Sequence, residues 1–170
     1  QMFINQLINA EGDPALLAQL LVDGAKLPGS DEEARIQLTA LITYADEVRT
    51  GAHPSPGRVS FVLPYMWAIQ APRDWPVFWA SSQRYLELFE GPVLPPDPAD
   101  RYMAFRERAA ELDINSWRFS MVTGWWDEHT PVFLNDVACD RCEPPVAADE
   151  LSNAHALVGI GTHLSAALSD

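Results

Sequence analysis

Apolar residues recur every three or four positions through the first fifty residues, which is the spacing of amphipathic helices. Residues 1–10 are expected to form a short helix. Asp13 and Pro14 then match a capping residue followed by proline at the first helical position. The leucines that follow predict a helix that ends at Pro28-Gly29; they are Leu16, Leu17, Leu20 and Leu21.

A second and longer helix is predicted from residue 30 onward. Ser30 and Glu33 have the spacing of a capping box, in which each side chain bonds the backbone of the other. Gly51 is placed to end this helix. Its apolar face is predicted to consist of Ala34, Leu38, Leu41, Ala45 and Val48.

The middle of the chain is richer in apolar and aromatic residues. Residues 59–70 form an apolar run without alternation, which is compatible with a buried helix or a buried strand. The length of the run favours a helix. Pro64 would then lie in the first turns of this helix or kink it. Residues 75–79 are expected to be a short extended piece. Ser81 or Ser82 is expected to cap the next helix, which Gly91 and Pro92 would end.

The last third gives weaker signals. Asp97-Pro98 is another helix start, and its apolar face would be Tyr102, Phe105, Ala109 and Leu112. Residues 117–126 are ambiguous, because their spacing fits both a helix and a strand. Residues 131–145 are expected to be mostly irregular. Asp149 is expected to cap a last helix. The pattern predicts an all-α or mostly α single domain over residues 1–170, with six to seven helices and at most a few short strands.

Charge narrows the possible partners. The chain has 170 residues and a net charge of −13, so its surface repels nucleic-acid backbones and anionic membranes at long range. DNA binding would therefore depend on a local arginine patch and on stacking. Without a secretory signal or an apolar run of about 18 residues, a cytoplasmic location and no membrane partner are expected. The chain begins at Gln1, and we interpret it as a piece excised from a larger protein.

Two patterns are candidates for chemistry. Cys139 and Cys142 form a single CxxC pair; with no second pair, ordinary cysteines are favoured over zinc or redox chemistry. Asp127, Glu128 and His129 could in principle do acid–base work, but neighbours on a helix point to different faces, so a solvated helix end is favoured. No nucleotide-binding or hydrolase motif occurs, and no cofactor, metal or catalytic residue is predicted.

Arginines and tryptophans are the remaining candidates for binding. Arg101 and Arg108 lie seven positions apart on one helical face, beside Arg106 and Arg118; they form either a solvated mixed-charge face or a phosphate-contact patch. Trp67 is expected in the core. Trp75 and Trp79 flank a proline-containing turn where partial exposure would let them stack on a nucleobase.

Residues 60–88 carry a family resemblance, centred on the Pro-Arg-Asp-Trp-Pro-Val-Phe turn at 72–78. The block resembles one near the N-terminus of large prokaryotic proteins of the McrBC-like AAA+ restriction type and related anti-phage defence nucleases. The resemblance implies a module joined to a motor or nuclease that acts on foreign or modified DNA.

We therefore expect a non-catalytic recognition or adaptor module that binds DNA or a partner domain of the same defence complex. The alternative is a protein-interaction or regulatory domain without nucleic-acid contact. The candidate DNA- or partner-binding residues are Arg73, Trp75, Trp79, Arg84, Arg101 and Arg108.

Overall fold

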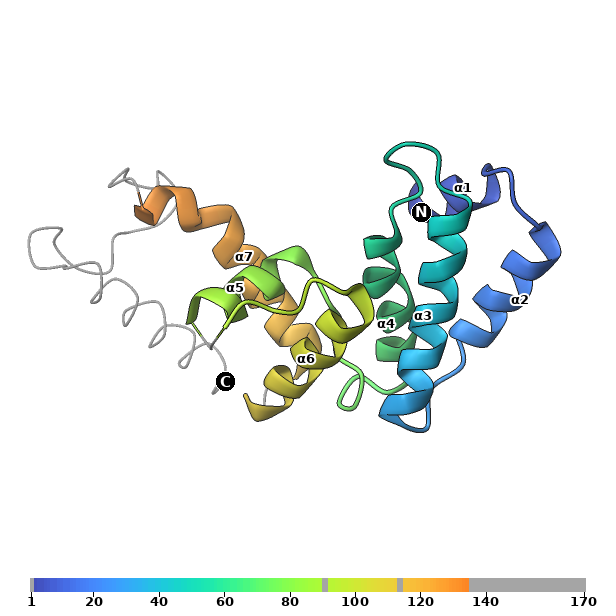
Figure 1. The fold of residues 1–170 in the computed structure, drawn as a ribbon. Coiled ribbons are helices and arrows are strands. Elements are labelled where there is room, and N and C mark those ends of the chain that lie inside the picture. Colours follow the sequence, from blue (N-terminus) through green and yellow to red (C-terminus); the bar gives the residue numbers. More distant parts are fainter. Residues whose placement is uncertain (1, 90–91, 113–114, 135–170) are drawn as a thin grey trace, which may run out of the picture. The chain divides into compact units, whose positions relative to one another are not determined.

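The computed structural model describes residues 2–89, 92–112 and 115–134, and within these residues every regular element is a helix and there is no β-strand (Figure 1). The predicted all-α class is confirmed. The elements are α1 Met2–Ile8, α2 Pro14–Gly24, α3 Asp31–Glu47, the 3₁₀ helix η1 Pro56–Arg58, α4 Val59–Gln70, α5 Ala80–Phe89, α6 Pro98–Glu111 and α7 Ser116–Leu134.

The chain divides into two compact units, residues 1–120 and residues 121–170, with the division inside α7. Most of the second unit lies outside the described residues, so the single-domain organisation over 1–170 stays a prediction. Cys139, Cys142 and the helix expected after Asp149 lie there too. The first unit contains α1 to α6 and the first turn of α7.

Three predicted helix starts are confirmed by side-chain caps. Asp13 Oδ1 accepts hydrogen bonds from the backbone N–H of residues 15 and 16, at 2.8 and 3.3 Å. Asp97 Oδ1 accepts from residues 99 and 100, both at 2.9 Å, and Ser30 Oγ accepts from the Glu33 N–H at 3.2 Å. Glu33 Oε2 accepts from Gly29 N–H at 2.8 Å rather than from Ser30, so the capping box closes one residue earlier than predicted.

Three helix boundaries differ from the prediction. Helix α2 ends at Gly24, with Ala25 as its C-cap, before the expected end at Pro28-Gly29. Helix α3 ends at Glu47, and Gly51 instead occupies a turn with φ of 65°, closed by backbone bonds between Thr50 and His53. Helix α5 begins at Ala80, before either serine, because the backbone carbonyl of Trp79 accepts the first helical bond, from Gln83 N–H at 2.9 Å. Backbone groups define the end of α3 and the start of α5, so no side-chain pattern marks these two boundaries.

Two ambiguous segments are helices. Residues 59–70 form α4 with Pro64 inside it, as the length of the run predicted. Residues 117–126 belong to α7, which continues through Leu134, so the irregular structure expected from 131 onward is wrong for residues 131–134. The remainder of that segment lies outside the described residues.

Helix α3 is the centre of the first unit and contacts α2, α4 and α6 (Figure 1). Its predicted apolar face is confirmed as buried from Ala34 to Ala45. Trp67 of α4 is fully buried beside it, and its ring lies 5.3 Å from the Trp75 ring and 5.9 Å from the Tyr102 ring, centroid to centroid. Trp67 Nε1 donates to the Gly24 carbonyl at 2.7 Å, which joins α4 to the end of α2.

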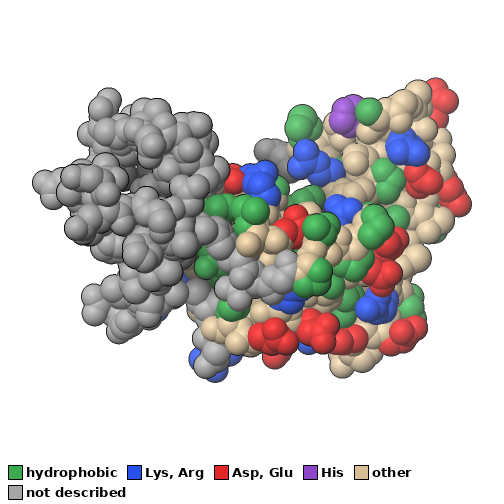
Figure 2. Space-filling view, turned by 60° about the vertical axis from the view of Figure 1, so that its left-hand side comes forward, with side chains coloured by type: hydrophobic (Ala, Val, Ile, Leu, Met, Phe, Trp, Pro, Cys, Tyr) green, Lys and Arg blue, Asp and Glu red, His purple; other side chains and the backbone are tan. Residues whose placement is uncertain are grey.

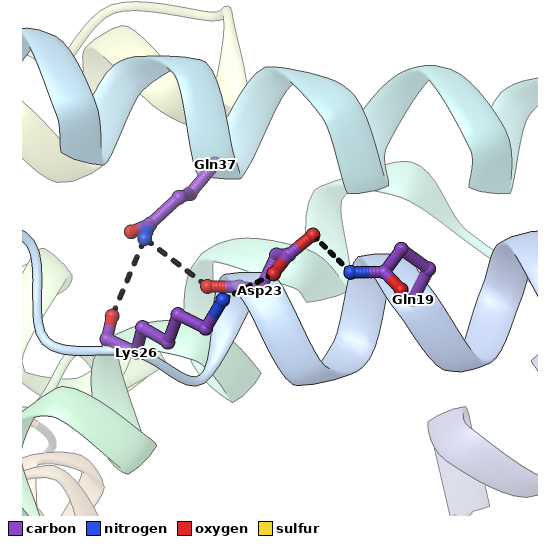
Figure 3. A network of polar contacts seen from close by, with 4 residues as sticks. All are labelled: Gln19, Asp23, Lys26 and Gln37. Carbon is purple, nitrogen blue, oxygen red and sulfur yellow. Dashed lines mark hydrogen bonds and ion pairs between the residues drawn. The ribbon is translucent and has the colours of Figure 1, made fainter.

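A polar network satisfies the carboxyl end of α2 (Figure 3). Gln37 of α3 donates from Nε2 to the backbone carbonyls of Asp23, in the last turn of α2, and of Lys26, just beyond the helix, at 3.1 and 3.4 Å. The Asp23 carboxylate accepts from Gln19 and from Lys26, each at 2.6 Å, and these hydrogen bonds lower the pKa of Asp23. Lys26, the only lysine of the chain, thus belongs to a structural contact.

Candidate binding surface

Three aromatic side chains from distant parts of the first unit meet at its surface. Tyr65 and Trp79 are each 40% exposed, and Trp117 is 36% exposed. The Tyr65 ring lies 6.2 Å from the Trp79 ring and 5.9 Å from the Trp117 ring, with interplanar angles of 58° and 84°. We call Tyr65, Trp79 and Trp117 the aromatic platform.

The platform is held by buried neighbours. Trp79 directly follows the fully buried Phe78, whose ring stacks on Phe61 at 5.0 Å with an interplanar angle of 5°. Phe61 lies one helical turn before Tyr65 on α4, so the two residues share a face. Trp117 sits in the first turn of α7, where Asn115 Oδ1 accepts from its backbone N–H at 3.0 Å. Packing of this kind fixes the rings in place before any ligand binds.

The segment that supplies most of this surface is poor in acidic residues. Residues 49–86 contain four arginines and one aspartate, a net charge of +3, whereas the whole chain carries −13. Arg58 is exposed and its guanidinium lies 5.9 Å from the centroid of the Phe61 ring, next to the platform along α4. Figure 2 shows acidic side chains gathered along the lower and right-hand edge of one face of the described residues. Charge on this molecule is therefore unevenly distributed.

Trp75 is not part of the surface. It is 4% exposed; one contact is the buried Trp67 ring, and the Arg106 guanidinium lies 4.1 Å from its ring centroid. The expectation that Trp75 is partly exposed is wrong, because α6 supplies an arginine that covers it. Trp79, on the other side of Pro76, is exposed as expected.

Arg101 and Arg108, the two residues of the possible phosphate-contact patch that share a helical face, are both only partly exposed. Arg101 donates to the backbone carbonyls of Pro95 and Pro96, at 2.9 and 2.5 Å, and so fastens the loop before α6. Arg108 Nη1 is buried and has no hydrogen-bond partner among the described residues. Arg73 and Arg84 are exposed, as binding residues must be, and Arg84 makes a contact of its own.

A groove of about 870 Å³ lies between α3, α6 and the 72–76 turn. Arginines and acids pair along it: Arg35 with Asp100, and Arg106 with Asp31 at 2.5 Å. Arg106 Nε also donates to the Asp74 carbonyl at 2.6 Å. Two of its three arginines, Arg35 and Arg106, are already paired with acids, and four acidic residues line the groove, so it is a poor site for phosphate.

Arg106→Lys is expected to lower the free energy of unfolding by about 1 kcal/mol, because lysine keeps the charge but loses the planar stack on Trp75 and the fork that bonds Asp31 and Asp74. Arg49→Lys is the matched control: its pair with Asp46, at 3.0 Å, is exposed on both sides. Urea denaturation measures both. Equal effects of the two substitutions would contradict the structural role of Arg106.

The other candidate chemistry gains no support. Asp127 and Glu128 are successive residues of α7, and the His129 side chain lies outside the described residues. Within the described part, no three His, Cys, Asp or Glu side chains gather where a metal ion could bind. No described helix has the length and apolar character needed to cross a membrane.

Comparison of the chain with family models, curated proteins and solved structures finds no match. The resemblance of residues 60–88 to McrBC-like proteins therefore stays a prediction.

Sequence reasoning identified Trp79 and missed Tyr65 and Trp117. A signal for Tyr65 exists: Phe61, Tyr65 and Ile69 recur every four residues within the apolar run, which marks one stripe of a helix. No local signal brings Trp117 to that stripe, because it lies 52 positions further along the chain.

Proposed function

We propose that this chain is a non-catalytic recognition module of a bacterial DNA-restriction or anti-phage defence protein, and that it binds DNA through the aromatic platform. The observation that carries the proposal is the contact of three exposed aromatic rings, two of them in the acid-poor segment 49–86. Aromatic rings stack on nucleobases, and a nearby arginine pairs with a phosphate. The resemblance of residues 60–88 adds the defence context.

Charge is the reason that binding is confined to one surface. With 23 of its 24 acids outside residues 49–86, the molecule repels a polyanion over most of its surface. DNA can approach where Arg58 and the platform lie. Such a module has modest affinity by itself and gains affinity from the domains or subunits joined to it.

The proposal is tested with a fluorescent forked DNA, which offers duplex and unpaired strands together, at several salt concentrations. Arg58→Ala is expected to flatten the slope of log K against log salt by about 0.7 to 0.9, the loss of one phosphate contact. Arg49→Ala, in the same acid-poor segment but already paired with Asp46, serves as the control and should leave the slope unchanged. Absence of binding even at low salt would overturn the proposal.

The net charge of −13 favours a second candidate, a protein-interaction or regulatory domain without nucleic-acid contact. Exposed Tyr and Trp side chains are also common centres of protein interfaces. Salt-sensitive DNA binding that depends on Arg58 would exclude this alternative as the sole function. Hydrolysis of DNA or nucleotide that disappears with Glu128→Gln and His129→Ala would instead contradict the non-catalytic part of the proposal.

A further inference from the structure

The geometry of the aromatic platform points to unpaired bases of single-stranded DNA as its ligand, in preference to an intact duplex. This inference rests on the proposed function and specifies which form of DNA the same surface takes. Three features of the surface support it: the directions and spacing of the rings, the scarcity of free polar groups on α4, and the small number of cations.

The rings face different directions. With interplanar angles of 58° and 84°, the two indoles are inclined to Tyr65 and do not form one flat floor. Their centroids lie 6.2 and 5.9 Å from the Tyr65 centroid, wider than the roughly 3.4 Å rise between bases stacked along a strand. Bases that stack on these rings must therefore be separated from one another, which an unpaired strand permits and a duplex resists.

Helix α4 has few of the groups that read a duplex. Recognition in the major groove requires donors and acceptors directed at base edges. The helix contains no charged residue, and its exposed side chains after the first turn are Tyr65, Ile69 and Gln70. The Gln70 amide already donates to the carbonyls of Ala25 and Met66, at 2.9 and 3.0 Å. After the first turn, the Tyr65 hydroxyl and the Gln70 amide oxygen are the polar groups left on the exposed side chains of α4, so stacking is the main recognition that this helix offers.

The charge near the platform suits a short single strand. Arg58 is the exposed cation that the ring contacts place beside α4, whereas duplex-binding proteins commonly neutralise several phosphates at once. A single strand can place a few nucleotides on the rings while its remainder stays away from the acidic surface. We expect a shallow salt dependence, with a slope of magnitude about 1.

The test compares a labelled 12-nucleotide thymidine strand with a duplex of the same length, by fluorescence polarisation and by quenching of tryptophan emission. We expect the single strand to bind at least about tenfold more tightly than the duplex. Trp79→Leu should weaken single-strand binding by roughly 5- to 150-fold, because leucine keeps an apolar side chain but cannot stack. Trp79→Phe, which keeps an aromatic face, should restore part of the affinity.

Ile36→Ala is the control, since Ile36 is an exposed apolar side chain of α3 outside the platform, and it should bind as the wild type does. Circular dichroism verifies that every variant is folded. Equal or tighter binding of the duplex, or single-strand binding that Trp79→Leu leaves unchanged, would overturn this inference while DNA recognition itself stands. Absence of binding to both forms at low salt would overturn the inference and the proposed function together.

Discussion

Trp67→Ala is expected to lower the free energy of unfolding by about 3–5 kcal/mol, the largest effect of any substitution considered for this protein. The side chain is fully buried between α2, α3 and α6, in contact with the rings of Trp75 and Tyr102. Its removal leaves a cavity and also leaves the Gly24 carbonyl without its donor. Urea denaturation followed by circular dichroism measures the change.

Trp79→Ala provides the matched comparison, because it removes the same side chain from a position that is 40% exposed. A loss below about 1.5 kcal/mol is expected there, since much of the indole is already in contact with water. The two variants differ in how they reach the platform: Trp79→Ala removes one of its rings directly, whereas Trp67→Ala acts on it only by loosening the core. Similar losses of stability in both variants would show that Trp67 is not the centre of the core.

The second large effect concerns alkaline pH. Burial raises the pKa of Tyr102 far above the ordinary value of about 10, and its hydroxyl donates to the Pro76 carbonyl at 3.2 Å. Above pH 10 the unfolded chain loses this proton while the folded chain keeps it. The stabilisation is therefore complete below pH 10 and is lost at about 1.4 kcal/mol per pH unit as the pH rises further.

Tyr102→Phe should remove the contribution of the Tyr102 hydroxyl to the fall of the unfolding free energy with pH above pH 10. Burial also raises the pKa of Tyr44, so a residual slope from Tyr44 is expected in the variant. At pH 8, where both tyrosines are protonated, the variant should lose only about 1 kcal/mol, the worth of the hydrogen bond to Pro76. Urea midpoints at pH 8 and between pH 10 and 11 test this, and identical slopes in wild type and variant would disprove it.

Trp67 and Tyr102 both act on the segment that carries the platform. The segment 75–79 sends Trp75, Val77 and Phe78 into the core and turns Trp79 outward. Trp67 contacts Trp75, and the Tyr102 hydroxyl holds the backbone at Pro76. The core thereby fixes the position of Trp79, and a loosened core is expected to weaken the platform as well.

The helix starts were accessible from sequence because their causes are local. A cap such as Asp13 or Asp97 bonds backbone groups two and three residues away, so the whole interaction lies inside a short stretch of chain. The apolar face of α3 likewise follows from its spacing alone. The helix boundaries at Glu47 and Ala80 were missed because backbone bonds, which have no side-chain signature, define them.

The sequence by itself determined that this protein is helical, where several of its helices begin, and that a proline-containing turn follows the apolar run 59–70. Only the tertiary structure decided which tryptophan beside that turn is buried. Arg106, more than thirty residues away, covers Trp75, while Trp79 meets Tyr65 and Trp117. The exposure of a side chain depends on which residues of other elements pack against it, and the local spacing of the sequence does not reveal such distant neighbours. The aromatic platform could therefore be recognised only from the three-dimensional structure.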